Sequence, residues 1–276
     1  MPVFDHVPLL HSALAFALFS ALLATTVGAS AQSDAPTPGV APTAQALPAS
    51  VDLRPRFQQW NLPTRRQGPR GTCSVFTVTG ALEYAAAAQQ GHGSRLSVEF
   101  LNWAGHRAVH RSADGGFFSE LWKGYEKFGI CLEDDLPYQR HYSHDLEPEQ
   151  AVLKSASVLI PARLSLYWIK EWNPHTGLTE AHVAEIKATL AKSWPVCGGF
   201  RWPKSAAWTE HVLQMCPPEE VFDGHSILLV GYKDDPAQPG GGAFIIRNSG
   251  GDGTDGYLPY AYVAAYMNDA AWIGNH

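Results

Sequence analysis

Several features that would point to other protein classes are scarce in this 276-residue chain. It has four cysteines and no C-x-x-C pair, so a structural zinc site is not expected. No run of lysine and arginine occurs, and the formal net charge is −6, so the sequence carries no electrostatic signature of nucleic-acid binding. No internal repeat occurs either. These absences favour an ordinary globular protein with one or two cores.

The four cysteines also limit the disulfides. They are Cys73, Cys131, Cys197 and Cys216. If Cys73 is a free nucleophile, at most one disulfide forms among the other three, and one thiol is left over. Cys197 and Cys216 are a possible pair only because they lie close together in the sequence.

The first 48 residues are expected to lie outside the folded core. Residues 9–28 are mostly apolar or small, and Ala29-Ser30-Ala31 supplies a signal-peptidase site. We therefore predict a signal peptide over residues 1–31 and a secreted or periplasmic mature chain. An uncleaved membrane anchor is the alternative. Residues 32–48, rich in Ala, Pro and Thr, are typical of a flexible linker or short pro-segment.

One stretch is expected to carry the chemistry. Residues 67–72 form a Gly/Pro-punctuated loop, and apolar residues then recur at helical spacing until the stop signal Gly91. Cys73 therefore falls in the first turn of a buried helix, whose electropositive N-terminus favours a thiolate. Gln67 lies just upstream, with a side-chain amide that can point to the same place.

The rest of the chain divides into a helical half and a β-rich half. Ser97 and Thr179 are predicted helix N-caps, and Gly129 is a predicted helix end. Short apolar or alternating segments predict strands; they cover residues 195–202, 226–232, 243–247 and 257–266. This order favours an α+β protein of two subdomains with a cleft between them.

Two residues of the β-rich half fit the chemistry of Cys73. His225 stands at the head of an apolar strand, and Asn248 follows the next apolar strand and precedes Ser249. A thiol nucleophile needs an imidazole to take its proton, a group that orients the imidazole, and donors for the oxyanion. Cys73 supplies the thiol, His225 the imidazole and Asn248 the orienting group, and Gln67 can supply an oxyanion donor.

The segments around Gln67, Cys73, His225 and Asn248 resemble those of papain-like cysteine peptidases, in a divergent bacterial-type form. Residues 49–54 resemble the start of the mature domain in that family. The resemblance implies a papain-like fold over residues 49–276. Its helical half would cover about 64–160, and its β-barrel-like half about 161–276 together with the strand in 49–63.

The resemblance also implies roles for individual residues. Cys73 would attack the scissile carbonyl as a thiolate, and His225 would protonate the leaving amine and then activate water. Asn248 would fix the imidazole tautomer. The Gln67 amide and the Cys73 N–H would hold the oxyanion.

Substrate-binding positions follow from the same resemblance. Gly115 and Gly116 would form the main-chain wall that binds an extended peptide, and Gly224 lies beside the histidine. Phe117 and Phe118 would lie near a hydrophobic side-chain pocket, and the alternative is that both are simply core residues.

Three residues depart from the family pattern. Arg70 replaces a half-cystine, Ser74 replaces the aromatic residue after the nucleophile, and Gly250 replaces a tryptophan that shields the Asn–His bond. We therefore expect a weak or narrowly specific enzyme unless Trp202 or Trp208 covers the site.

The expected function is that of a cofactor-free cysteine endopeptidase acting on polypeptides. We expect a monomer, no nucleic-acid partner and no stable membrane association after signal cleavage. The alternatives are a catalytically weak or inactive papain-fold binding protein and an acyl-transfer enzyme on the same scaffold. His106 and His110 have a zinc-compatible i, i+4 spacing, but without the Glu of a zincin motif we expect an exposed helix face and no metal.

Overall fold

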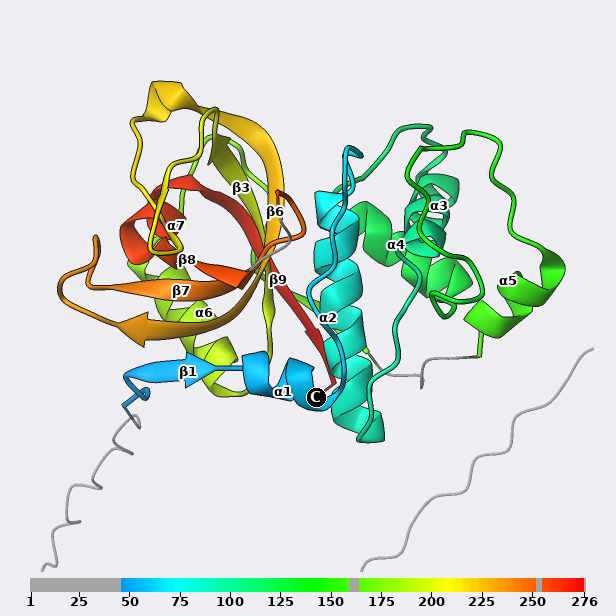
Figure 1. Cartoon of the computed structure of the whole chain (residues 1–276), viewed down its shortest axis with the longest axis horizontal. Coiled ribbons are helices and arrows are strands. Elements are labelled where there is room, and N and C mark those ends of the chain that lie inside the picture. Colours follow the sequence, from blue (N-terminus) through cyan, green and yellow to red (C-terminus); the bar gives the residue numbers. More distant parts are fainter. Residues whose placement is uncertain (1–45, 159–163, 252–254, 276) are drawn as a thin grey trace, which may run out of the picture. The chain divides into compact units, whose positions relative to one another are not determined.

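The computed structural model describes residues 46–158, 164–251 and 255–275, which belong to one compact unit. The predicted signal peptide and most of the predicted linker lie outside the described residues. The helical half contains four helices, labelled in Figure 1: α2 (Cys73–Gln90), α3 (Val98–Val109), α4 (Phe118–Phe128) and α5 (Gln150–Ala156). None of the helices in the described part of the chain is long and apolar enough to cross a membrane.

A nine-stranded, mostly antiparallel sheet makes up the second half. Its strands are β1 (Ser50–Asp52), β2 (Ser165–Lys170), β3 (Val196–Pro203), β4 (Trp208–Thr209), β5 (Val212–Leu213), β6 (Val221–Asp234), β7 (Gly242–Arg247), β8 (Asp255–Pro259) and β9 (Met267–Gly274). Their order is β2-β9-β3-β6-β7-β8-β5-β4, and β1 pairs with β6. Three helices, α1 (Arg54–Gln59), α6 (Glu180–Ala191) and α7 (Tyr260–Tyr266), accompany the sheet, and the one-turn η1 (Pro218–Glu220) precedes β6.

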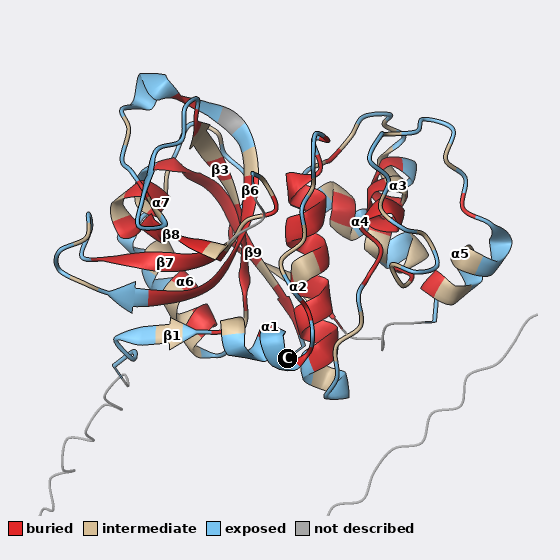
Figure 2. Cartoon of the chain, in the orientation of Figure 1, coloured by how far each residue is buried: buried red, intermediate tan, exposed pale blue. Residues whose placement is uncertain are grey.

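Helix α2 lies between the sheet and the other helices of its own half (Figure 1). Figure 2 shows it buried along nearly its whole length, because it is covered from both sides. Most of its side chains are accordingly apolar or small, apart from the buried Glu83, which pairs with Arg65, and the helix ends at the left-handed Gly91. The first turn of α2 therefore meets the sheet at the boundary between the two halves.

Several predicted boundaries are confirmed. Ser97 accepts a hydrogen bond from the Phe100 N–H as the N-cap of α3, and Thr179 caps α6 in the same way through the N–H of His182. Gly129 terminates α4. The strands predicted at 195–202, 226–232 and 243–247 correspond to β3, β6 and β7.

The strand predicted over residues 257–266 is wrong beyond Pro259. Residues 260–266 form α7, because Tyr260, Val263 and Tyr266 recur at helical spacing and turn toward the core. The sequence interpretation also missed β2 and β9. Almost all residues of β9 are buried, so it lacks the polar–apolar alternation by which strands are recognised.

Candidate active site

Cys73 is the first residue of α2, with Thr72 as the N-cap. Its side chain is buried, and Sγ lies 3.8 Å from the carbonyl oxygen of Gly224, to which the thiol donates. Burial raises the pKa of the Cys73 thiol, and the backbone N–H groups of Ser226 and Ser74 offset part of that rise. The expected preference of the helix N-terminus for a thiolate is therefore opposed by desolvation.

His225 on β6 and Asn248 at the end of β7 form a hydrogen bond of 2.9 Å between Nε2 and Oδ1. The N–H of Gly250 donates to the same oxygen, also at 2.9 Å. Since a backbone N–H can only donate, the atom between them is the amide oxygen, and Nε2 must carry the proton. Nδ1 is then the nitrogen left to exchange a proton with a thiol.

Trp202 covers the imidazole of His225. The two ring centroids are 4.7 Å apart, with an interplanar angle of 60°. Gly250 lies on another side, where an added Cβ would be 3.1 Å from His225 Cε1 and 3.3 Å from Asn248 Oδ1. Burial lowers the pKa of His225, and the bond to Asn248 raises it again in part. Trp202, from β3, thus covers the imidazole in place of the tryptophan that the family pattern has after Asn-Ser.

Gln67 is held by Ser249 and Arg70. Its N–H donates to the Ser249 carbonyl, and its Oε1 accepts from the Ser249 hydroxyl, each at 2.9 Å. Its Nε2 donates to the Arg70 carbonyl at 2.9 Å, which uses one of the two amide protons. The side chain is therefore fixed beside the residue that follows Asn248, with one amide proton left.

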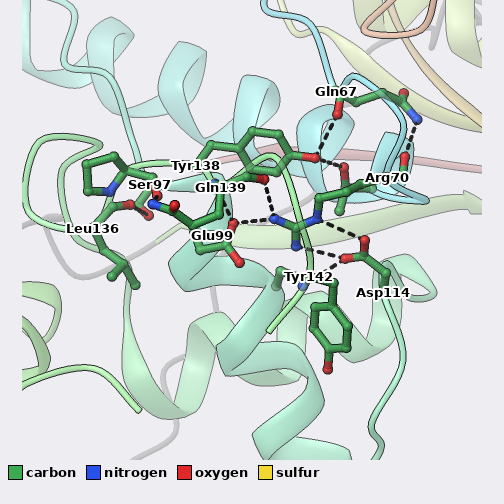
Figure 3. Close-up of polar contacts among 12 residues, drawn as sticks. Gln67, Arg70, Ser97, Glu99, Asp114, Leu136, Tyr138, Gln139 and Tyr142 are labelled. Carbon is green, nitrogen blue, oxygen red and sulfur yellow. Dashed lines mark hydrogen bonds and ion pairs between the residues drawn. The ribbon is translucent and has the colours of Figure 1, made fainter. Parts of the chain in front are cut away.

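Arg70 occupies the half-cystine position and forms a buried ionic cluster (Figure 3). Its guanidinium pairs with Asp114 through two bonds of 2.9 Å, pairs with Glu99, and donates to the Gln139 carbonyl. It also lies over the Tyr138 ring at 4.6 Å. The cluster connects the loop before Cys73 to α3 and to the segments around residues 114 and 139.

The loop at Gly115 and Gly116 is fixed against the start of α2. Gly115 has φ +75°, and an added Cβ would lie 2.2 Å from the Gly71 carbonyl, so only glycine fits. Gly116 donates its N–H to the Ser74 hydroxyl at 3.2 Å. Ser74, a departure from the family pattern, thus connects the nucleophile's helix to this loop.

A cavity of about 350 Å³ lies between these elements. It brings together five of the predicted residues, Cys73, Gly116, Phe117, Gly224 and His225. Gly115, Gln67 and Asn248 do not line the cavity; Asn248 is bonded to His225, which does, and Gly115 precedes Gly116. Phe117 is 45% exposed at the cavity, which excludes it from the core, whereas Phe118 is buried and also lines the cavity.

Two predictions about other side chains need correction. His106 does not lie on an exposed face: it is buried, and its Nε2 is 2.7 Å from the Gly115 carbonyl oxygen. No cluster of three or more potential metal ligands occurs among the described residues, which include both His106 and His110. All four cysteines are described and all are free thiols, so Cys197 and Cys216 are not paired.

Sequence reasoning missed six residues that line the cavity from the β-rich half: Trp172, Gly199, Phe200, Ser226, Asn268 and Asp269. Phe200 stands opposite His225 in the β3–β6 pairing, so a correct strand register would have found it. Asn268 and Asp269 lie on β9, whose uniform burial conceals it in the sequence.

The architecture is that of the papain-like cysteine proteases. The crystal structure of xylellain, a cysteine protease from Xylella fastidiosa, superposes with a TM-score of 0.65 at 21% identity, covering 84% of this chain and 87% of that one. A family model described as papain family cysteine protease matches residues 47–269. The chain therefore belongs to the papain family.

Curated relatives agree with this membership. Cysteine proteinase 2 of Zea mays is 28% identical over 242 residues, which cover 85% of this chain and 62% of the relative. Pro-cathepsin H of Mus musculus is 27% identical over 216 residues, covering 76% of this chain and 59% of the relative. The chain thus spans about three fifths of the length of these relatives.

Proposed function

We propose that this protein is a cysteine endopeptidase in which Cys73, His225 and Asn248 perform the chemistry. The observation that carries the proposal is the oriented pair His225–Asn248, which lines one cavity together with the thiol at the start of α2. The Nε2 proton is held by Asn248, so Nδ1 accepts the thiol proton and later delivers it to the leaving amine. Family membership supports the assignment of the reaction.

The oxyanion is assigned to two donors. The Cys73 N–H, in the first turn of α2, has no acceptor within the helix and is one donor, and the second amide proton of Gln67 is the other. The Ser249 hydroxyl and the Arg70 carbonyl orient that amide. Removing the Gln67 amide, as in Gln67→Ala, should lower kcat about 100- to 1000-fold.

Export belongs to the same proposal, because residues 9–31 have the composition of a signal peptide and its cleavage site. N-terminal sequencing of the protein recovered from producing cells tests this point. A mature chain beginning at Gln32 supports export, and retention of residues 1–31 in a membrane fraction supports the anchor instead.

Thiol labelling tests the chemistry directly. Wild-type protein is treated with limiting iodoacetamide or a peptidyl epoxide, and the modified cysteine is located by peptide mapping. Cys216 serves as an internal reference, because it is more exposed than Cys73 and lies outside the cavity. Labelling of Cys73 ahead of Cys216, with loss of that preference in His225→Ala, is the expected result.

A binding protein without peptidase activity is the second candidate. One observation favours it: burial raises the pKa of Cys73 and lowers that of His225, and both shifts favour the neutral pair. Labelling of Cys73 no faster than a model thiol would establish this candidate over the enzyme. Transfer to an added amine, detected by mass spectrometry of the products, would instead indicate acyl transfer.

A further inference from the structure

The two donors assigned to the oxyanion are held in different ways. The Cys73 N–H belongs to the first turn of α2, so the helix itself fixes its direction. The Gln67 amide is carried by the loop 67–72, which contains two glycines, and Gly68 has φ +64°. Because glycine restricts the backbone least, an amide on this loop needs bonds from outside the loop to keep a fixed distance from the thiol.

Gln67 is bonded to both halves of the molecule. On the β-rich side, Ser249 accepts the Gln67 N–H and donates its hydroxyl to Oε1, and Ser249 directly follows Asn248. On the helical side, the Gln67 carbonyl oxygen accepts a hydrogen bond of 2.8 Å from the hydroxyl of Tyr138 (Figure 3). Tyr138 lies in the segment between α4 and α5, so a side chain from the helical half reaches the residue that carries the oxyanion amide.

The hydroxyl of Thr72 completes the connection to the helix of the nucleophile. Thr72 Oγ1 lies 2.7 Å from the hydroxyl oxygen of Tyr138. Since the Gln67 carbonyl can only accept, the one hydroxyl proton of Tyr138 goes to Gln67, and Thr72 is the donor in the second bond. Thr72 is the N-cap of α2, but its side chain makes no capping bond to the helix, as threonine usually does there. The residue before Cys73 is instead linked to Gln67 through one phenol oxygen.

Tyr138 is itself held by contacts that do not involve its hydroxyl. Its ring packs edge-on against Phe76 of α2, with centroids 4.9 Å apart, and the Arg70 guanidinium lies over the ring at 4.6 Å. Its backbone N–H donates to Glu133 Oε1 at 2.9 Å. Burial raises the pKa of Tyr138, so the hydroxyl keeps its proton and remains a donor at neutral pH. Removing the oxygen alone therefore leaves the ring in place.

We infer that Tyr138 is a positioning residue for the oxyanion site, and that its hydroxyl fixes the Gln67 amide relative to Cys73. Ser249 fixes the same amide relative to the His225–Asn248 pair, so the two attachments together set the distances of the donor from the thiol and from the imidazole. Tyr138 does not line the cavity, so it acts through Gln67 and not by contact with a peptide. This inference rests on the proposed peptidase function.

Steady-state kinetics of Tyr138→Phe test the inference. On one defined peptide, kcat should fall about tenfold while KM stays within about twofold of wild type, because a displaced donor weakens the bond to the oxyanion and not the binding of the peptide. Tyr142→Phe is the matched control: its ring also lies near Arg70, at 5.7 Å, but its hydroxyl is 3.4 Å from His106 Nδ1. The control should keep both constants within about twofold of wild type. An unchanged kcat in Tyr138→Phe would overturn the inference.

Two further measurements show whether the effect passes through Gln67. In a Gln67→Ala background no amide is left to position, so adding Tyr138→Phe should lower kcat by less than about twofold more. A further loss as large as that in the wild type would contradict the inference.

Alkylation of Cys73 by iodoacetamide is the second measurement. The sulfur displaces iodide from a saturated carbon, so no oxyanion forms, and the rate in Tyr138→Phe should stay within about twofold of wild type. A retained rate also shows that the site is folded in the variant. A rate that falls as far as kcat would assign the hydroxyl to the thiol–imidazole pair, against the inference.

A measurement without substrate separates this inference from the proposed function. The side-chain amide signals of Gln67 are identified by NMR in isotope-labelled wild type through their absence in Gln67→Ala. We expect these signals to shift in Tyr138→Phe and to stay unchanged in Tyr142→Phe. A shift in Tyr138→Phe alone supports the positioning role even if no peptide is ever cleaved. Gln67 signals that do not move would overturn the role of Tyr138, while the peptidase assignment would still be decided by thiol labelling.

Discussion

Two buried carboxylates, one in each half of the molecule, have opposite surroundings. Glu99, in the first turn of α3, is 1% exposed and is paired with Arg70, and it also accepts the Gln139 N–H. Asp269, on β9, is 4% exposed and leaves Oδ1 without a partner. The first carboxylate completes a closed network that holds the loop before Cys73. The second faces the cavity, so it is the one available to substrate.

The difference shows why burial alone does not identify a functional group. Within a closed cluster, a buried charge holds its partners in place, and removing it leaves their charges buried and unpaired. At an open cavity, a buried charge raises the free energy of the empty protein and recovers that cost when a cation arrives. Removing the cation beside Glu99 and removing the charge of Asp269 should therefore change the free energy of unfolding in opposite directions.

The largest effect is expected from Arg70→Met. Loss of the guanidinium leaves Glu99 and Asp114 without their cation, and removing one partner of a buried pair typically destabilises by about 3–5 kcal/mol. Chemical denaturation at pH 7 measures the free energy of unfolding. The double variant Arg70→Met, Glu99→Gln is the control, and it should recover part of the loss. A single variant as stable as the wild type would show that the cluster is not structural.

The smaller and opposite effect is expected from Asp269→Asn. Because burial raises the pKa of Asp269 to about 6, the folded state holds its proton more tightly than the unfolded chain does. Stability contributed by this group is therefore lost as the pH rises from about 4 to 6. Above pH 7, Asp269→Asn should be more stable than the wild type by up to about 3 kcal/mol, at roughly 1.4 kcal/mol per pKa unit.

Denaturation curves at pH 4.5 and pH 8 check this sign. The advantage of Asp269→Asn should shrink at pH 4.5, where the wild-type carboxyl is mostly protonated. Asp134→Asn, which removes an exposed charge, should differ little from the wild type at both pH values. A destabilised Asp269→Asn at pH 8 would mean that Lys170 already compensates the carboxylate.

The sequence was sufficient to predict the two halves of the fold and insufficient to predict the surroundings of either buried carboxylate. Cys73, His225 and Asn248 stand in segments with recognisable helix, strand and turn signals, so the division into a helical and a β-rich half could be predicted from them. Arg70 was noted only as a replaced half-cystine, because its partners at positions 99 and 114 are brought to it by the tertiary fold.

Asp269 had no local signal at all. It lies on β9, which follows directly after α7 and is buried almost throughout, so no polar–apolar alternation marks the strand in the sequence. Its position opposite Gly199 depends on the β3–β9 register, which the sequence does not show. Trp202 and Trp208 were the two candidates expected to cover the site in place of a tryptophan at position 250, and Trp202 is the one that packs against His225. Its choice over Trp208 depends on strand pairing across a bulge in β3.

The smallest effect is expected from Gly250→Trp. The family pattern suggests that a tryptophan here would shield the His225–Asn248 bond, but Trp202 already covers the imidazole at 4.7 Å. A Cβ at position 250 would also lie 3.1 Å from His225 Cε1, so the new side chain requires a small shift of the ring. We therefore expect kcat/KM for a neutral peptide within about threefold of the wild type, less than 1 kcal/mol in the barrier.

Trp202→Ala is the matched comparison, because it removes the existing cover. It should lower kcat/KM about tenfold, by exposing the Asn–His bond to water and freeing the imidazole. Combining the two changes decides between them: Gly250→Trp should restore activity to Trp202→Ala if either tryptophan can shield the bond. A combined variant no better than Trp202→Ala would show that Trp202 positions the ring from β3 in a way that a residue after Asn248 cannot replace.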